Sequence, residues 1–186
     1  QDCPLCYKFQ YVLQVPSLQK TYFSMGTVVH SVIEHLSRAQ QEGYLPTKER
    51  ALELLNSCWS SQAYTSRTHE LEDRVKAEAL LETYLAWQAA NRNTITGTEK
   101  KFQFTLNGRT VKGYIDRIER TPEGEYVVVD FKTGSKPGTL TKNSVPLDIQ
   151  LNLYCLALKE MYGKLPQRAS FYYIKDNKMV DYFPTE

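Results

Sequence analysis

The sequence predicts a mixed α/β domain whose helical cap precedes a sheet, and three observations predict it. Apolar residues in the first half recur at helical spacing, whereas the second half alternates or forms short apolar runs. Asn107-Gly108 is the strongest short hairpin signal available, and Pro122 and Gly124 mark another turn. An apolar helix predicted over 145–163 then separates the first strands from the last ones.

The composition is that of one folded domain. The chain has 186 residues, of which 41% are hydrophobic, so a core can form and disorder is not expected. No apolar run is long enough to cross a membrane. We therefore predict a single domain over 1–186, with a helical part over 1–95 and a sheet part over 96–186. The missing initiator Met suggests a fragment of a longer polypeptide.

Three helices are predicted in the first half, over residues 24–43, 47–62 and 68–91. Thr47 is suited to cap the second of them. The residues expected to face the core are Met25, Val29, Ile33 and Leu36 in the first helix, and Leu71, Val75, Leu81 and Leu85 in the third.

Five strands are predicted in the second half. Three antiparallel strands come first, within 98–106, 109–119 and 125–131. The segment "EYVVVDF" is apolar enough to be buried on both faces, yet Asp130 and Lys132 stand at its end. The predicted helix over 145–163 has Gly163 past its end, and a last hairpin turns at Asp176-Asn177.

The turn lengths predict which strand residues face one another. A two-residue turn at Asn107-Gly108 places Glu99 opposite Asp116, and a turn centred near Glu123 places Asp116 opposite Asp130. Three carboxylates should therefore lie side by side across three neighbouring strands. A bulge in either strand would move one of them to the other face.

Crowded carboxylates repel one another, and burial increases the penalty because each loses its water. A cation must lie among them. Lys132 is one candidate, since it shares a face with Asp130; a divalent ion with oxygen ligands is the other. The alternative is a solvated sheet face. Because side chains alternate along a strand, apolar residues share the face of the carboxylates, and an apolar face favours a site over a solvated surface. These residues are Tyr114, Ile118, Tyr126 and Val128.

The ordered motifs "GYIDRIE", "VVVDFKTG" and "DIQLNLYCLAL", preceded by "GTVVH", resemble the PD-(D/E)XK nuclease superfamily. The similarity is greatest to the C-terminal nuclease domain of RecB and AddB helicase–nucleases and to CRISPR-associated RecB-like exonucleases. It covers most of the chain. It implies a restriction-endonuclease-like fold: a mixed sheet with helices on both faces and an N-terminal helical cap.

The resemblance also implies roles for individual residues. Asp116 and Asp130 resemble the two metal-binding acids, and Lys132 the motif lysine. His30 resembles an additional metal ligand on a helix, and the Phe131 carbonyl a backbone ligand. The remaining residues resemble positions that line the site, namely Gln150, Tyr154 and, more loosely, Glu99. Without the resemblance, His30 would be interpreted as a helix histidine that is hydrogen-bonded to Glu34. Gln150 and Tyr154 would be interpreted as part of the polar side of an amphipathic helix.

The cysteines predict no metal cluster within this chain. Some relatives hold an iron–sulfur cluster with one early and three late cysteines, and Cys3 could be the early one. No late triplet follows, because the last cysteine is Cys155. Cys3 and Cys6 form at most half of a structural zinc site.

The function expected from this resemblance is a Mg²⁺- or Mn²⁺-dependent deoxyribonuclease. We expect an exonuclease that acts on single strands or DNA ends in repair, with a fused or associated helicase, in the cytoplasm of a bacterial or phage-infected cell. The net charge of +2 means that DNA must be met by a local patch. Candidate cations are Lys136, Lys142, Lys100, Lys101 and Lys112. The alternatives are a nuclease-dead module that binds DNA or a helicase, and a CRISPR-adaptation nuclease.

Overall fold

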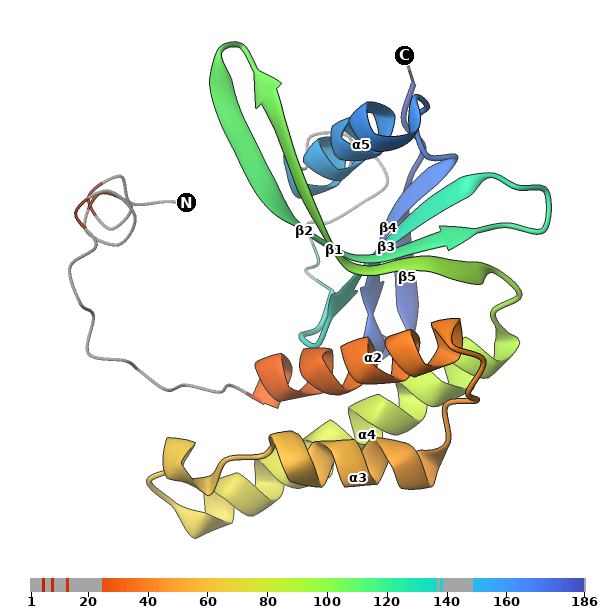
Figure 1. Cartoon of the computed structure of the whole chain (residues 1–186). Helices are drawn as coiled ribbons and strands as arrows, with labels where there is room; N and C mark the ends of the chain where they lie inside the picture. The colour runs from red at the N-terminus through yellow and green to blue at the C-terminus, as the bar shows by residue number, and fades with distance from the viewer. Residues whose placement is uncertain are drawn as a thin grey trace.

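In the computed structural model, a five-stranded mixed sheet lies between helices on its two faces (Figure 1). The structure describes residues 25–136, 138 and 149–185, together with Leu5, Lys8 and Leu13. Within those residues, none of the helices combines the length and the apolar character that a membrane crossing requires.

Three long helices precede the sheet and pack together on one of its faces (Figure 1). The segments that precede the sheet are α2 (Met25–Gln41), α3 (Lys48–Cys58), the short η2 (Ser61–Ala63) and α4 (Arg67–Ala90). Thr47 caps α3 as predicted, because its hydroxyl accepts a hydrogen bond from the Arg50 amide at 3.2 Å.

The strands run in the order β1-β2-β3-β4-β5 across the sheet. They are β1 (Thr94–Leu106), β2 (Arg109–Arg120), β3 (Tyr126–Lys132), β4 (Arg168–Tyr173) and β5 (Lys178–Tyr182), with α5 (Ile149–Tyr162) before β4 and η4 (Ile174–Asp176) after it. All neighbours are antiparallel except β3 and β4, which are parallel. Helix α5 covers the opposite face from α2, α3 and α4 (Figure 1), so the predicted fold class is confirmed.

The register predicted from the turns is also confirmed. Leu106 pairs with Arg109 across Asn107-Gly108, and the same count holds down to the pair Gly97 and Ile118. In the next hairpin Arg120 pairs with Tyr126, and Arg117 with Val129. Both counts place Glu99, Asp116 and Asp130 at the same level of the sheet.

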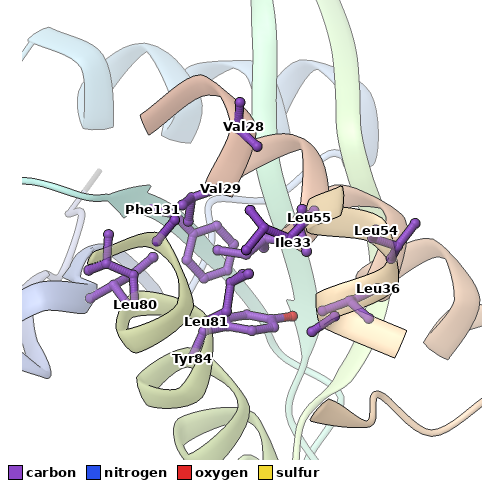
Figure 2. Close-up of a cluster of buried hydrophobic side chains, with 14 of the residues drawn as sticks. Val28, Val29, Ile33, Leu36, Leu54, Leu55, Leu80, Leu81, Tyr84 and Phe131 are labelled. Atoms are coloured by element: carbon purple, nitrogen blue, oxygen red, sulfur yellow. The ribbon is translucent and has the colours of Figure 1, made fainter. Parts of the chain in front are cut away.

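Strand β3 is buried on both faces, and it joins two apolar cores. Val127, Val129 and Phe131 belong to the cluster under α2, α3 and α4, part of which is shown in Figure 2. Val128 belongs to the cluster under α5, together with Leu158 and others. Any rearrangement of β3 would therefore disturb packing on both faces.

Two expectations about the core are wrong. Leu71 and Val75 of α4 are 48% and 67% exposed. The buried side of α4 consists instead of Ala77, Leu80, Leu81, Tyr84 and Gln88, together with Glu70 near its start. At 3.6 residues per turn, Val75 points almost directly away from the line through Ala77, Leu81 and Tyr84. Tyr114 was expected on an apolar face, but it is 54% exposed.

The close approach of the Phe102 ring to the β2 backbone explains why position 113 is a glycine. A Cβ atom at this position would lie 2.8 Å from Cζ of Phe102, whose buried ring also contacts Phe104 and Tyr154. We predict that Gly113→Ala lowers the free energy of unfolding by about 1–3 kcal/mol, because the ring has to move into packed neighbours.

Urea denaturation of this variant beside Gly134→Ala would test the prediction. A Cβ at Gly134 meets nothing within 4 Å among the described parts of the chain, and its φ is not positive. The control should therefore keep wild-type stability. Equal stability of the two variants would show that Phe102 is not held in place.

Candidate active site

Strands β2 and β3 separate just beyond the pair Arg117–Val129, and two aspartates stand at this point, which we call the β2–β3 fork. Strand β3 continues past the fork, paired with β4 as far as Lys132 and Tyr173. The Phe131 amide donates a hydrogen bond to Oδ2 of Asp116 at 3.0 Å. The Asp116 carboxylate thus binds the β3 backbone where the ladder between the two strands ends.

The alternation of β2 breaks at the fork. Ile115 and Ile118 both belong to the cluster under α5, although they are three positions apart. Arg117 faces α4, where it reaches Tyr84. On β1, Glu99 has a positive φ of 45° opposite this irregularity. Parity predicts that Asp116 shares a face with Ile118, which belongs to the cluster under α5. The Asp116 side chain instead contacts His30 of α2, so that expectation is wrong.

Asp116 lies in an environment that disfavours its charge. Oδ2 is 3.6 Å from Nδ1 of His30, and the side chain is 16% exposed. Burial, followed by the nearby charge of Asp130, raises the pKa of Asp116 to about 8, against the opposing effect of the Phe131 amide. Burial also lowers the pKa of His30, which favours the neutral imidazole that can bind a metal.

Asp130 is the most buried acid of the site, with a side chain only 2% exposed. Oδ1 accepts hydrogen bonds from Nε2 of Gln150 at 2.8 Å and from the Tyr154 hydroxyl at 3.2 Å. Oδ2 is 2.6 Å from Nζ of Lys132, but no donor among the described residues forms an aligned hydrogen bond with it. Burial raises the pKa of Asp130, although Lys132 opposes this shift.

Gln150 on α5 contacts three other residues of the site, namely Asp130, Lys132 and Tyr154. Its Oε1 accepts a hydrogen bond from Nζ of Lys132 at 3.0 Å, and its Nε2 also lies 2.7 Å from the Tyr154 hydroxyl. The Lys132 ammonium also sits 4.8 Å from the centre of the Phe171 ring. The lysine is thus held beside Asp130 by a carboxylate, an amide and an aromatic face.

The structure also brings His30, Glu99 and Phe131 to the fork. Glu99, His30, Asp116 and Phe131 line one narrow recess together with Glu34 and Thr98. Burial and the charge of Glu34 raise the pKa of Glu99. Lys136 is on the loop after β3, and its backbone amide donates to Asp176 at 2.7 Å. Its backbone is therefore anchored to η4.

In the part of the chain that the structure describes, no three His, Cys, Asp or Glu side chains are grouped closely enough to share one ion. His30 and Asp116 are in contact, but Asp130 is drawn toward Lys132, Gln150 and Tyr154. The donor set nevertheless suits a hard divalent cation, since two buried carboxylates repel each other and no donor in the described chain forms an aligned hydrogen bond with Oδ2 of Asp130.

The predictions about Cys3, Cys6 and Lys142 lie outside the described residues. Of the described cysteines, Cys58 is partly buried and Cys155 is buried. Burial raises the pKa of Cys155 to about 12, so its thiol stays protonated and unreactive at neutral pH.

Sequence reasoning missed a buried ion pair next to Asp116. Arg117 and Glu119 are 0% and 1% exposed, and Nε of Arg117 lies 2.7 Å from Oε1 of Glu119. The guanidinium also donates to Tyr84 and Gln88 of α4 and lies 5.9 Å from the centre of the Phe131 ring. Amides of Asn91 and Asn93 donate to Glu119, each at 2.8 Å.

This network links α4 to both strands of the fork. Opposite charges two positions apart in an apolar strand, as in "DRIE", are the signal that could have revealed it, because they match the spacing of Asp130 and Lys132. Arg117 therefore lies between α4 and the strands that carry Asp116 and Phe131.

We predict that Arg117→Met costs about 3–5 kcal/mol of unfolding free energy, since it leaves the buried Glu119 without its charge partner. The double variant Arg117→Met/Glu119→Leu should lose less than Arg117→Met alone. Urea denaturation measures these variants beside Glu119→Leu and the wild type. A double variant as unstable as the sum of the two single variants would contradict the assignment of a coupled pair.

Three kinds of comparison relate this chain to known proteins. A family model described as PD-(D/E)XK nuclease superfamily matches residues 1–184. The Gene 69 protein of Mycobacterium phage D29 is 26% identical over 201 residues, covering 95% of this chain and 71% of the phage protein. Its counterpart from phage L5 is 25% identical, covering 98% and 75%.

A bacterial relative is much longer than this chain. An ATP-dependent helicase/deoxyribonuclease subunit of Streptococcus agalactiae serotype Ia is 28% identical over 178 residues, covering 89% of this chain and 16% of the bacterial protein. Among solved structures, the crystal structure of SSO0001 aligns with a TM-score of 0.36 at 18% identity, covering 98% of this chain and 77% of that chain.

Proposed function

Because the chain belongs to the PD-(D/E)XK nuclease superfamily, we propose that it hydrolyses phosphodiester bonds of DNA with a divalent metal ion at the β2–β3 fork. The observation that carries the proposal is the placement of Asp116 and Asp130 at the fork, with Lys132 2.6 Å from Asp130. Two buried acids that repel each other lower the stability of the fold even with a cation beside them. A protein usually retains such an arrangement because it serves the function.

The residues proposed to hold the ion are Asp116, Asp130, His30 and the carbonyl of Phe131. Mg²⁺ or Mn²⁺ suits this set of oxygen donors with one imidazole. When bound, the ion supplies a Lewis acid for the phosphoryl oxygen and a more acidic water. Asp130 lies against Lys132 and Gln150, so we expect its carboxylate to turn when the ion binds.

Lys132 is proposed to orient the attacking water and to offset the negative charge that develops on the phosphorus oxygens. Gln150 and the Phe171 ring hold its ammonium near Asp130. Gln150 and Tyr154 are proposed to fix the Asp130 rotamer and to line the substrate channel. Glu99, beside Asp116 in the recess, would help to bind a second ion if two are used.

The substrate proposed is DNA, as single strands or ends, with little sequence preference and exonucleolytic cleavage. The name of the S. agalactiae relative, which describes an ATP-dependent helicase/deoxyribonuclease, supports both the DNA substrate and an associated helicase. A role in repair is part of the proposal. Lys136, on the loop that follows the motif, is proposed to contact phosphates. We place this activity in the cytoplasm of a bacterial or phage-infected cell.

We predict that Asp130→Ala and Lys132→Ala each lower the rate of DNA cleavage by at least about 10²–10³, the usual effect of removing one electrostatic group from such a site. End-labelled DNA incubated with Mg²⁺ or Mn²⁺ gives the rates. Lys164→Ala is the matched control, because Lys164 is exposed and paired with Glu125 far from the fork. Wild-type rates in the two site variants would refute the proposal.

DNA binding without cleavage by the wild-type protein, in every metal tested, would favour the nuclease-dead alternative. Folding of each variant should be checked by circular dichroism, since a loss of structure also removes activity.

Metal removal gives a test that does not depend on activity. We predict that Mg²⁺ or Mn²⁺ at about 100 times its Kd stabilises the wild-type protein by about 2.7 kcal/mol. Asp116→Asn should abolish this gain. In EDTA at neutral pH it should be more stable than wild type by on the order of 1 kcal/mol, because Asp116, with a pKa of about 8, must take up a proton or bury its charge when the chain folds, and the amide needs neither.

Thermal unfolding with EDTA and with added metal measures both effects. Asp181→Asn is the control, since Asp181 lies on β5 and pairs with Ser170 and Arg168. It should respond to metal as the wild type does. An equal metal response in Asp116→Asn would show that the ion binds elsewhere.

A further inference from the structure

The hairpin formed by the outer parts of β1 and β2 projects from the sheet beside α5 (Figure 1). Residues 100–115 form this arm. They contain four cations, namely Lys100, Lys101, Arg109 and Lys112, and no Asp or Glu. The arm therefore carries more positive charge than the +2 of the whole chain.

The two faces of the arm differ. Phe102, Phe104, Val111 and Ile115 belong to the core under α5 or pack against it. On the other face the cross-strand pairs are Lys101 with Tyr114, Gln103 with Lys112, and Thr105 with Thr110. All six of these residues are exposed. A pair of directly opposed residues shares one face, so this face is polar, basic and carries one aromatic ring.

The four cations of the arm are not neutralised by other side chains that the structure describes. Within the described chain, none of Lys100, Lys101, Arg109 and Lys112 makes an ion pair or a hydrogen bond through its side chain. The Tyr114 ring is 54% exposed and, within the same residues, contacts no other ring. Other surface lysines are neutralised, such as Lys48 by Glu82, Lys76 by Asp73 and Lys164 by Glu125.

The arm leads directly to the acids. Lys101 is two residues from Glu99, and Tyr114 is two residues from Asp116. At about 3.3 Å per strand residue, Lys112 lies about 13 Å from Asp116, a few nucleotides from a phosphate held at the fork. Cations spaced along a strand beside an aromatic ring suit a single strand, whose phosphates meet lysines while an unstacked base meets the ring.

We propose that the outer face of this arm binds single-stranded DNA next to the scissile phosphate, with Lys101 and Lys112 on phosphates and Tyr114 stacked on a base. This inference rests on the proposed function for its substrate, but it concerns a surface outside the metal site. A basic strip alone would serve duplex DNA equally well. The exposed ring is the feature that favours a single strand.

Fluorescence anisotropy with a labelled oligo-dT, in EDTA so that no cleavage occurs, tests the surface. Lys101→Gln/Lys112→Gln should weaken binding at least about tenfold and reduce the slope of log K against log salt by about 1.4, the value for two phosphates of a single strand. Lys159→Gln/Lys178→Gln removes the same charge from α5 and β5 and should leave both quantities unchanged.

Tyr114→Ala should weaken binding about 5- to 150-fold, the range for one stacked base, without changing the salt slope. Tyr114→Phe keeps the ring and should bind like wild type. Since Tyr114 is exposed, neither variant should unfold the protein, and circular dichroism checks this.

Four results would overturn the inference: no binding by the wild type, unchanged affinity in the lysine variant, an equal loss in Tyr114→Phe and Tyr114→Ala, or a loss confined to duplex DNA. A protein that binds oligo-dT through the arm but never cleaves it would refute the proposed function alone. Cleavage with the same KM in wild type and arm variants would count against the arm alone.

Discussion

The repulsion between Asp116 and Asp130 is the constraint on which the rest of the site depends. Both acids are withdrawn from water at the fork, and burial raises the pKa of each. Strand β3 cannot move away to relieve this, because its valines and Phe131 are packed into cores on both faces. The fold therefore holds the two acids together at a cost, and Lys132 offsets only part of it.

The same sheet also contains a buried pair of opposite charges, which compensate each other. Arg117 and Glu119 are fully buried, yet they neutralise each other and are surrounded by donors and acceptors from α4 and Asn91 and Asn93. A pair of opposite charges has no net charge to attract an ion. At the fork two carboxylates lie near a single lysine, and this excess of negative charge separates the proposed site from the structural pair.

Much of this arrangement could be predicted from the sequence. Turn lengths determined the register, because Asn107-Gly108 permits only a tight hairpin, and so Glu99, Asp116 and Asp130 were placed at one level. The face of Asp116 could not be predicted, because alternation fails where Glu99 adopts a positive φ. Leu81 and Leu85 of α4 face the core as predicted. The rest of its buried side was missed because Ala77, Tyr84 and Gln88 are weaker apolar signals than Leu71 and Val75.

A crystal soaked in MnCl2 and measured at the manganese absorption edge would test the central claim most directly. We predict an anomalous peak at the β2–β3 fork, from an ion bound by carboxylate oxygens of both Asp116 and Asp130, with the His30 imidazole as a further ligand. A well-occupied peak elsewhere, or an empty fork with Asp130 still paired to Lys132, would contradict it.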